Sequence, residues 1–474
     1  MKKVALFSLQ NSIKKSITEF FDKKEIERLG RISGFIKRRS KLTAYRFLLT
    51  LMFSRFAGDK LSLNDLCNEL DDKFGCHIAK QSLDERFNPE TVQFLKMAVS
   101  QSFSKKLVSN SNLPFLSHFS AIKIQDSTSF QLPKNLSGSY AGTGGSSTGA
   151  LARIQFEYDL KSMEMTTLDL TSGAYQDVTY SKDYAGSIEK GELLVRDLGY
   201  ISRDFMRTVI KQEAFFINRL RDKQNVYIKQ DSGDLVKLDF TQLLRRMKQR
   251  KVQSEELDIF IEIEGEFLEM RLIAEKLPDE VYAKRIRKAE KGIKKKGYNL
   301  TDSYKARARF NLFVTNVDKG VLNTRNVGYL YSLRWQVELV FKSWKSTFNI
   351  AKVKAFKKER FECQILARLL LIIISWKMFS TLNKASVSAT NRKSPLIMSY
   401  YKFNKLIYAR LESFMLAIIY RGIWFNRFIS SLIRKAVGKN QNIEAKNRTF
   451  ASIHICEILQ HCSELQRFNI KNAA

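Results

Sequence analysis

A segment in the second half of the chain places four polar side chains along one face of a predicted helix. The segment spans positions 331 to 345 and reads YSLRWQVELVFKSWK. Its polar stripe consists of Tyr331, Arg334, Glu338 and Lys345. At roughly 100° per residue, these side chains project within a sector of about 60°. The pattern predicts a helix that presents a carboxylate, two cations and a phenol on one side, which suits holding a metal ion and gripping phosphates.

The same helix carries a second, apolar face. At helical spacing its apolar side chains fall between about 180° and 280° around the axis. They are Leu333, Val337, Val340, Phe341, Trp344 and Phe348. We therefore expect this side of the helix to pack into a hydrophobic core.

Two further acids sit where strands are expected to end. Asp126 closes the alternating stretch AIKIQD, and Asp197 closes LLVRD. Mg²⁺ and Mn²⁺ prefer oxygen ligands, and two such ions about 4 Å apart can activate an attacking hydroxyl and stabilise a leaving oxygen. Either aspartate alone is weak evidence, because aspartate is common in turns. Together with Glu338 they predict a site for two divalent ions.

The charge of the chain favours a polyanionic partner. Its 474 residues include 81 Lys+Arg against 48 Asp+Glu, a net charge of +33. An excess of this size needs a polyanion to neutralise it, and nucleic acid is the usual one. An anionic membrane surface and a merely solvated basic surface are the alternatives.

The order of periodic segments predicts a mixed α/β fold. Three strands of a meander are expected first, followed by helices that alternate with strands. The expected strands are 121–126, 153–159, 165–171, 192–197, 214–220 and 310–315, and the helices between them are 182–190 and 202–212. This order describes a mixed sheet with helices on its faces.

Pattern shifts divide the chain into four regions. We expect a helical DNA-binding region at 1–115 and a catalytic domain formed by 116–220 and 310–380. A β-rich basic insertion at 221–309 interrupts that domain, with short strands at 226–228, 259–263 and 267–273. The last region, 381–474, is helical and is a candidate for dimerisation.

A helix-turn-helix is one reading of the N-terminal region. Ser62 and Asp65 form a capping-box pattern before helix 63–73, and a turn leads to helix 79–87. Lys80, Gln81 and Arg86 would then face a groove of DNA. Many helical hairpins share this pattern, so an ordinary hairpin is the alternative.

The insertion carries dense basic runs. One contains Lys284, Arg285, Arg287, Lys288 and Lys291, and it ends in Lys294, Lys295 and Lys296. A solvated cationic face is the plain reading of such a run. In a chain this basic, contact with backbone phosphates is the favoured one.

The polar stripe and the two aspartates resemble a known family. The spacing Tyr-x2-Arg-x3-Glu-x6-Lys is similar to the signature of bacterial insertion-sequence transposases of the DDE class, of the insertion sequence four type. Asp126 in IQDSTSFQLP and Asp197 in LLVRDLGY resemble the first and second acids of that group. The resemblance covers roughly residues 120 to 350. It implies a ribonuclease-H-like fold and metal-dependent DNA cleavage and strand transfer.

The resemblance also implies roles for individual residues. Asp126, Asp197 and Glu338 would hold two divalent ions, Mg²⁺ or Mn²⁺, while Tyr331, Arg334 and Lys345 would grip the terminal phosphates. Arg219 resembles a basic residue of the family, although a structural ion pair is an equal reading. Phe310 is a candidate to stack on a flipped base, and Asn311 aligns about as well. The implied partners are double-stranded DNA, at the terminal inverted repeats and at the target, and a second copy of the chain.

Two other functions remain open from the residues. One is a non-catalytic DNA-binding repressor derived from a transposase, although an unused cluster of carboxylates would repel itself. The other is a ribonuclease-H-like nuclease acting on other nucleic acids. Metal-dependent nicking would exclude the repressor, and end-specific binding would exclude the general nuclease.

The sequence favours a cytoplasmic, nucleoid-associated bacterial protein. The five cysteines form no CxxC pair, which fits a reducing compartment. Lys2 and Lys3 precede only a short apolar run without a cleavage site, so no secretion signal is predicted. The apolar run Ile365–Trp376 contains Arg368 and is too short to span a bilayer, so we expect a core helix.

Overall fold

A ten-stranded mixed sheet and a large set of helices make up the protein, which confirms the mixed α/β prediction. The computed structural model describes residues 3–54, 62–104, 118–144, 149–162, 164–221, 224–294, 299–388 and 399–436. The strands are hydrogen-bonded in the order β3-β2-β1-β4-β5-β10-β9-β8-β6-β7. The chain divides into two units, one formed by 1–111, 127–175 and 336–474, the other by 112–126 and 176–335.

The second unit carries most of the sheet. Its strands are the start of β1 (Ile122–Gln131), β4 (Leu193–Arg196), β5 (Phe215–Arg219), β6 (Tyr227–Lys229), β7 (Leu235–Lys237), β8 (Ser254–Ile263), β9 (Glu266–Lys276) and β10 (Phe310–Thr315). β1, β4 and β5 are parallel neighbours, whereas β10, β9 and β8 continue the sheet antiparallel. Neighbouring parallel strands bring their carboxyl ends to one edge, where α/β folds bind ligands.

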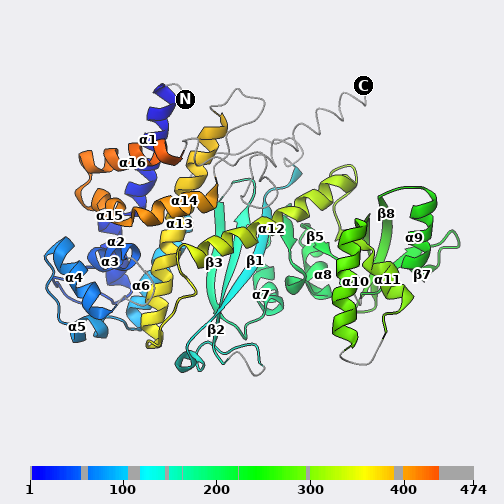
Figure 1. Cartoon of the computed structure of the whole chain (residues 1–474), viewed down its shortest axis with the longest axis horizontal. Coiled ribbons are helices and arrows are strands. Elements are labelled where there is room, and N and C mark those ends of the chain that lie inside the picture. The colour runs from blue at the N-terminus through cyan, green and yellow to red at the C-terminus, as the bar shows by residue number, and fades with distance from the viewer. Residues whose placement is uncertain are drawn as a thin grey trace. The chain divides into compact units, whose positions relative to one another are not determined.

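Helices of the second unit pack against this sheet (Figure 1). They are α7 (Asp177–Tyr184), η3 (Ala185–Ser187), η4 (Leu198–Tyr200), α8 (Arg203–Lys211), α9 (Phe240–Gln249), α10 (Asp279–Lys294), α11 (Asp302–Ala308) and the start of α12 (Thr324–Ser346). Their core residues include Phe205 of α8 and Met247 of α9, which are buried together with strand residues such as Phe310 of β10.

The first unit is largely helical. It contains β2 (Leu151–Asp159) and β3 (Glu164–Ser172), which pair antiparallel, and the short η2 (Lys134–Leu136). Its helices are α1 (Lys3–Phe20), α2 (Lys23–Ile32), α3 (Ala44–Phe53), α4 (Leu63–Phe74), α5 (Lys80–Glu85), α6 (Pro89–Ser104), α13 (Lys358–Ser388), α14 (Tyr400–Ala409), α15 (Leu411–Tyr420) and α16 (Gly422–Ala436). The rest of α12 completes it.

Helix α13 is the central helix of this unit and contacts α1, α3 and α6 (Figure 1). It is longer than the predicted run, and its stretch Lys358–Leu382 is long and apolar enough to cross a membrane. Of the most apolar window in that stretch, 94% is buried inside the protein. This burial is that of a core helix, as the sequence predicts.

Helix α12 confirms the amphipathic pattern of the central segment. It begins at Thr324, and its six predicted apolar residues are all buried. Gly328 allows the helix to approach β9, because a Cβ at this position would lie 2.3 Å from the Oε1 atom of Glu275. A larger residue there would force the Glu275 carboxylate to move.

Most predicted elements are confirmed within a few residues, but the helix expected at 182–190 is α7 at Asp177–Tyr184 followed by η3, and two further predictions differ. Asp126 does not end a strand, because β1 continues to Gln131. The second helix of the expected helix-turn-helix is also shorter than predicted. The capping box of Ser62 and Asp65 opens α4 and Gly75 closes it in a left-handed conformation, but α5 has only 6 residues and Arg86 is its C-cap.

Candidate active site

Asp126 and Asp197 lie at adjacent positions of neighbouring parallel strands. The register of β1 and β4 pairs Gln125 with Arg196, so each aspartate is the next residue along its strand. Asp126 is 9% exposed, and Asp197 begins the turn of η4 directly after β4. Their proximity follows from the parallel register, which places the interior of β1 at Asp126 beside the carboxyl end of β4.

Arg334 of α12 bridges the two carboxylates. Its Nη1 atom donates to Oδ2 of Asp126 at 2.6 Å, and its Nε atom lies 3.6 Å from Oδ1 of Asp197. The guanidinium is only 7% exposed. Burial opposes its charge, but the carboxylates of Asp126 and Asp197 outweigh burial and raise the pKa of Arg334 above its usual value.

Tyr331 is the third buried member of the group. Its ring packs against Phe313 of β10 with centroids 5.1 Å apart, and the Arg334 guanidinium lies 5.7 Å from the Tyr331 ring centroid. Burial raises the pKa of the Tyr331 phenol, and Arg334 and Arg219 partly oppose this rise. The phenol is therefore a neutral hydroxyl at physiological pH, able to donate a hydrogen bond.

Glu338 and Lys345 lie further along α12. The Glu338 side chain is exposed, one helical turn after Arg334. The Nζ atom of Lys345 donates to the backbone oxygen of Ser129 at 2.8 Å, and partial burial lowers the pKa of its ammonium. Of the four residues of the polar stripe, Glu338 alone is exposed.

A buried arginine that sequence reasoning missed lies directly before Asp197. Arg196 is fully buried, donates to Oγ of Ser181 at 2.9 Å, and lies over the rings of Tyr184 and Phe205. These contacts fix the end of β4 from which Asp197 projects. The signal in the sequence was a charged residue inside the apolar strand LLVR, which needs buried partners.

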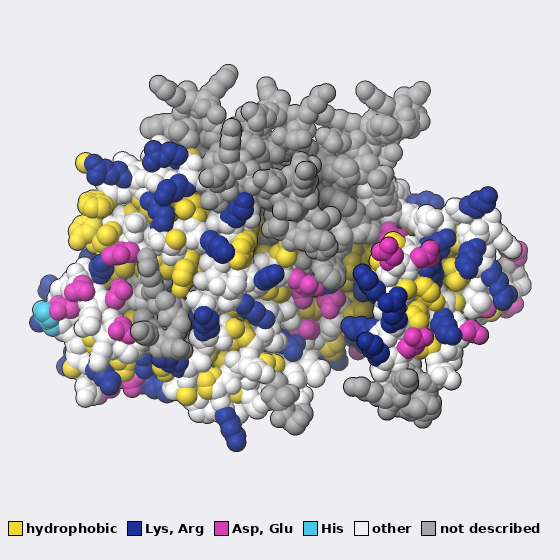
Figure 2. Space-filling view, in the orientation of Figure 1, with side chains coloured by type: hydrophobic (Ala, Val, Ile, Leu, Met, Phe, Trp, Pro, Cys, Tyr) yellow, Lys and Arg dark blue, Asp and Glu magenta, His cyan; other side chains and the backbone are white. Residues whose placement is uncertain are grey.

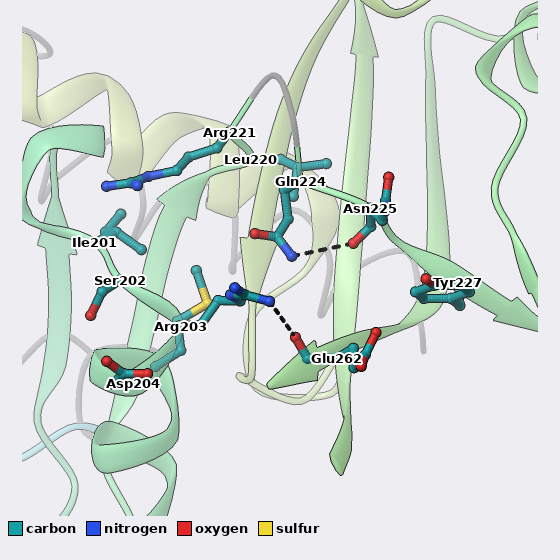
Figure 3. Close-up of a pocket in the computed structure, with 11 residues that line it drawn as sticks. Ile201, Ser202, Arg203, Asp204, Leu220, Arg221, Gln224, Asn225, Tyr227 and Glu262 are labelled. Carbon is teal, nitrogen blue, oxygen red and sulfur yellow. Dashed lines mark hydrogen bonds between the residues drawn. The ribbon is translucent and has the colours of Figure 1, made fainter. Parts of the chain in front are cut away.

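A cavity of about 480 Å³ opens beside the turn that follows Asp197 (Figure 3). It is lined by Ile201, by the start of α8, by Glu262 of β8 and by a set of side chains around the end of β5 and the start of β6, namely Leu220, Arg221, Gln224, Asn225 and Tyr227. Arg221 donates to the Leu198 oxygen at 3.1 Å, and Arg203 donates to the Glu262 backbone oxygen at 3.4 Å. Its lining mixes cations and carboxylates, so its charge alone favours no particular ligand.

Comparisons with known proteins decide the family. The model of the transposase DDE domain matches residues 117–374. The transposase for insertion sequence element IS1151 of Clostridium perfringens is 33% identical over 77% of this chain and 79% of its own length. Those for IS231B of Bacillus thuringiensis subsp. berliner and IS231E of B. thuringiensis subsp. finitimus are 30% and 31% identical over 80% and 74% of the chain, and over 80% and 76% of their own lengths.

The chain belongs to the DDE transposase family. It is a transposase of the insertion-sequence class, as its motifs predict. The matched domain contains Asp126, Asp197 and the whole of α12, so the residues of the predicted site lie within the family region.

The DDE transposase family uses divalent metal ions, and the donor chemistry of the site fits them. Asp126 and Asp197 supply carboxylate oxygens from one edge of the sheet, which hard cations prefer. Within the described residues, no group of three His, Cys, Asp or Glu side chains lies close enough to hold a metal ion. The structure therefore brings two of the predicted acids together, and the inclusion of Glu338 stays a prediction.

The remaining predicted DNA contacts of the transposase are spread over the chain. Lys80 and Gln81 are exposed on α5, and Arg86 is half-buried. Arg219 ends β5, opposite Phe313 of β10.

The contacts predicted for Phe310 and for Lys294, Lys295 and Lys296 stay predictions. Phe310 is 2% exposed in the core, its ring 6.4 Å from that of Phe240, so stacking on a base would require it to leave the core. Asn311 accepts a hydrogen bond from Arg285. Lys294 ends α10, whereas Lys295 and Lys296 lie outside the described residues.

Proposed function

We propose that this transposase hydrolyses phosphodiester bonds at the ends of an insertion sequence and joins the freed 3′-hydroxyl to target DNA. The observation that carries this proposal is the pair Asp126 and Asp197, which the parallel register of β1 and β4 places next to each other and which Arg334 bridges. Transfer of a phosphoryl group between oxygens requires positioning and charge stabilisation, with little covalent chemistry by the protein. A carboxylate pair inside a basic protein suits that task.

In this proposal Asp126, Asp197 and Glu338 hold two ions, Mg²⁺ or Mn²⁺. When bound, the ions activate the attacking oxygen and stabilise the leaving oxygen. The carboxylates would determine where the ions bind, and the buried contacts of Arg196 with Ser181 and Tyr184 would hold the end of β4 directly before Asp197. A ribonuclease-H-like arrangement of the catalytic region belongs to the same proposal.

The positively charged side chains of the site would contact the terminal phosphates. Arg334 and Lys345 offer charged donors, and Tyr331 offers a neutral hydroxyl donor. Arg219, whose positive charge lowers the pKa of the Tyr331 phenol, would add a further contact. Arginine suits this role because its planar fork binds a phosphate through two parallel hydrogen bonds.

The four-region division completes the proposal. Region 1–115, with Lys80, Gln81 and Arg86, would recognise the terminal repeat, and region 221–309 would contact flanking phosphates. Pairing of two ends requires two copies of the protein, with 381–474 as the candidate contact between them. The bacterial cytoplasm, in association with the nucleoid, is the proposed location.

End cleavage tests the proposed activity directly. A labelled duplex carrying the DNA that borders the element should be nicked at the element's ends in Mg²⁺ or Mn²⁺, and a duplex with scrambled ends should not. Binding without nicking in either metal would favour the repressor, and nicking of both duplexes alike would favour a general nuclease.

The exposed face of α10 yields a prediction on salt dependence. Lys284, Arg287, Lys288 and Lys291 are exposed at offsets 0, 3, 4 and 7 and therefore share one side of the helix. Figure 2 shows Lys and Arg side chains gathered over α10. Arg285 anchors the helix by donating to the Phe310 oxygen at 2.7 Å. This rigid basic face is suited to DNA phosphates.

Replacing these four cations by Gln should weaken binding to any duplex. Because each phosphate contact contributes about 0.9 to the slope of log affinity against log salt, the slope should fall by about 3 to 4. Fluorescence anisotropy at several salt concentrations measures it. The control is Lys182→Gln with Lys190→Gln, since both ammonium groups already pair with carboxylates, at 4.0 Å and 2.5 Å. An unchanged slope in the fourfold variant would remove α10 from the interface.

A further inference from the structure

We propose that Arg334 occupies the carboxylates of Asp126 and Asp197 in the DNA-free protein, so that a DNA phosphate must draw the guanidinium away before these carboxylates bind a divalent cation. Arg334 would then be a positioning residue with two successive partners. The inference rests on the proposed function, because it takes the two aspartates as metal ligands and Arg334 as a phosphate contact.

The first step is the geometry of the bridge. One guanidinium reaches both acids, at 2.6 Å from Asp126 and 3.6 Å from Asp197. Arg334 and Asp126 are 7% and 9% exposed, so the nearer contact is shielded from solvent. A buried, charge-assisted hydrogen bond of this length is among the stronger contacts that a carboxylate makes.

The second step is competition for the same oxygens. A divalent cation binds a carboxylate through the lone pairs that here face the guanidinium. A cation placed between the two acids would also lie within a few ångströms of the Arg334 charge, in a partly buried site where repulsion is weakly screened. Arg334 in its present position therefore lowers the affinity of the pair for cations.

The third step is the release of Arg334. A phosphate can accept hydrogen bonds from the guanidinium in the same geometry as a carboxylate. A DNA strand also carries further phosphates nearby, which add negative charge. When Arg334 moves to the phosphate, the freed carboxylates gain the cation, so every charge keeps a partner. Binding of the DNA end and of the cation are then coupled, and the coupling acts equally in both directions.

The sign of a metal-affinity change tests the inference. Mn²⁺ binding by the full-length protein without DNA is measured by electron paramagnetic resonance of the free ion. Arg334→Gln should bind Mn²⁺ more tightly by roughly tenfold or more, because it removes the competing charge. Arg334→Lys should stay near the wild type. Adding a duplex with the element's end should tighten Mn²⁺ binding by the wild type and change Arg334→Gln little.

Arg207→Gln is the matched control. Arg207 also bridges two acids in the same unit, pairing with Glu264 and, at 2.6 Å, with Glu266. The control should leave Mn²⁺ affinity unchanged. An equal gain in both variants would show that the gain comes from the lower net positive charge of the protein, and it would overturn the inference. Weaker or unchanged Mn²⁺ binding by a folded Arg334→Gln protein, judged by circular dichroism, would also overturn it.

A further double variant tests the proposed metal ligands independently of the role of Arg334. Asp126→Asn with Asp197→Asn should abolish the tight Mn²⁺ binding of Arg334→Gln, since that variant's extra affinity belongs to these carboxylates. Retained binding would show that the cation lies elsewhere, which contradicts the metal assignment itself. Loss of binding, together with the gain in Arg334→Gln, supports both.

Discussion

Glu338→Gln is expected to reduce cleavage at the element's ends by at least about a thousandfold while leaving end binding nearly unchanged. Glutamine has almost the shape of glutamate but lacks the negative charge that a divalent ion requires. Because the Glu338 side chain is exposed, the substitution should cost little folding stability. Cleavage is measured on a labelled end duplex in Mn²⁺, and binding by mobility shift in Ca²⁺.

Glu189→Gln makes the same chemical change at another exposed glutamate and should leave both measurements unaltered. Equal loss of binding and cleavage in Glu338→Gln would refute the assignment of Glu338 as a metal ligand. Full cleavage by this variant would refute it as well, and would direct attention to the acids around Asp126 and Asp197.

Local pattern was enough to predict the helix that carries the site. The helical course of positions 331–345 and the burial of the apolar face follow from spacing alone, because a helix repeats its environment every three to four residues. Strand β10 likewise matches its predicted range, Phe310–Thr315. Five of its six residues are buried, and it lies between β5 and β9 inside the sheet.

Pairings between distant segments could not be read from pattern. Arg334 and Asp126 are separated by 208 positions, and only the parallel register of β1 and β4 brings both aspartates within its reach. The sequence predicts that Asp126 ends a strand, because the alternating stretch AIKIQD closes on this acid. The structure extends β1 to Gln131. Strand pairing is made by the backbone and tolerates polar side chains, so an apolar-polar pattern does not show where such a strand ends.

Burial also separates two residues with similar motif evidence. Phe310 and Tyr331 both carry aromatic rings in the family region, and both are almost fully buried. Tyr331 lies beside the charges of Arg334 and Asp197, whereas Phe310 lies among core side chains. A sequence motif fixes the residue type, but only the packing decides whether a ring can reach DNA.

Trp344→Ala is expected to lower the free energy of unfolding by about 3 to 5 kcal/mol. Trp344 is fully buried, and its ring lies 5.3 Å from that of Phe156 and 5.4 Å from that of Phe341. Its indole Nε1 donates to the Tyr400 hydroxyl at 3.1 Å. Alanine would leave a large cavity and remove this donor from a buried phenol, whose pKa burial raises to about 12. Urea unfolding followed by circular dichroism measures the loss.

Trp344→Phe separates packing from hydrogen bonding at this position. Phenylalanine keeps most of the ring contacts but leaves the Tyr400 hydroxyl without the indole donor, so we expect a loss of only about 1 to 2 kcal/mol. If alanine cost no more than phenylalanine, the ring contacts with Phe156 and Phe341 would contribute little to stability. Because Trp344 lies on the helix that carries Arg334 and Glu338, a large loss on truncation would mean that the same packing that stabilises the fold also fixes the helix of the site.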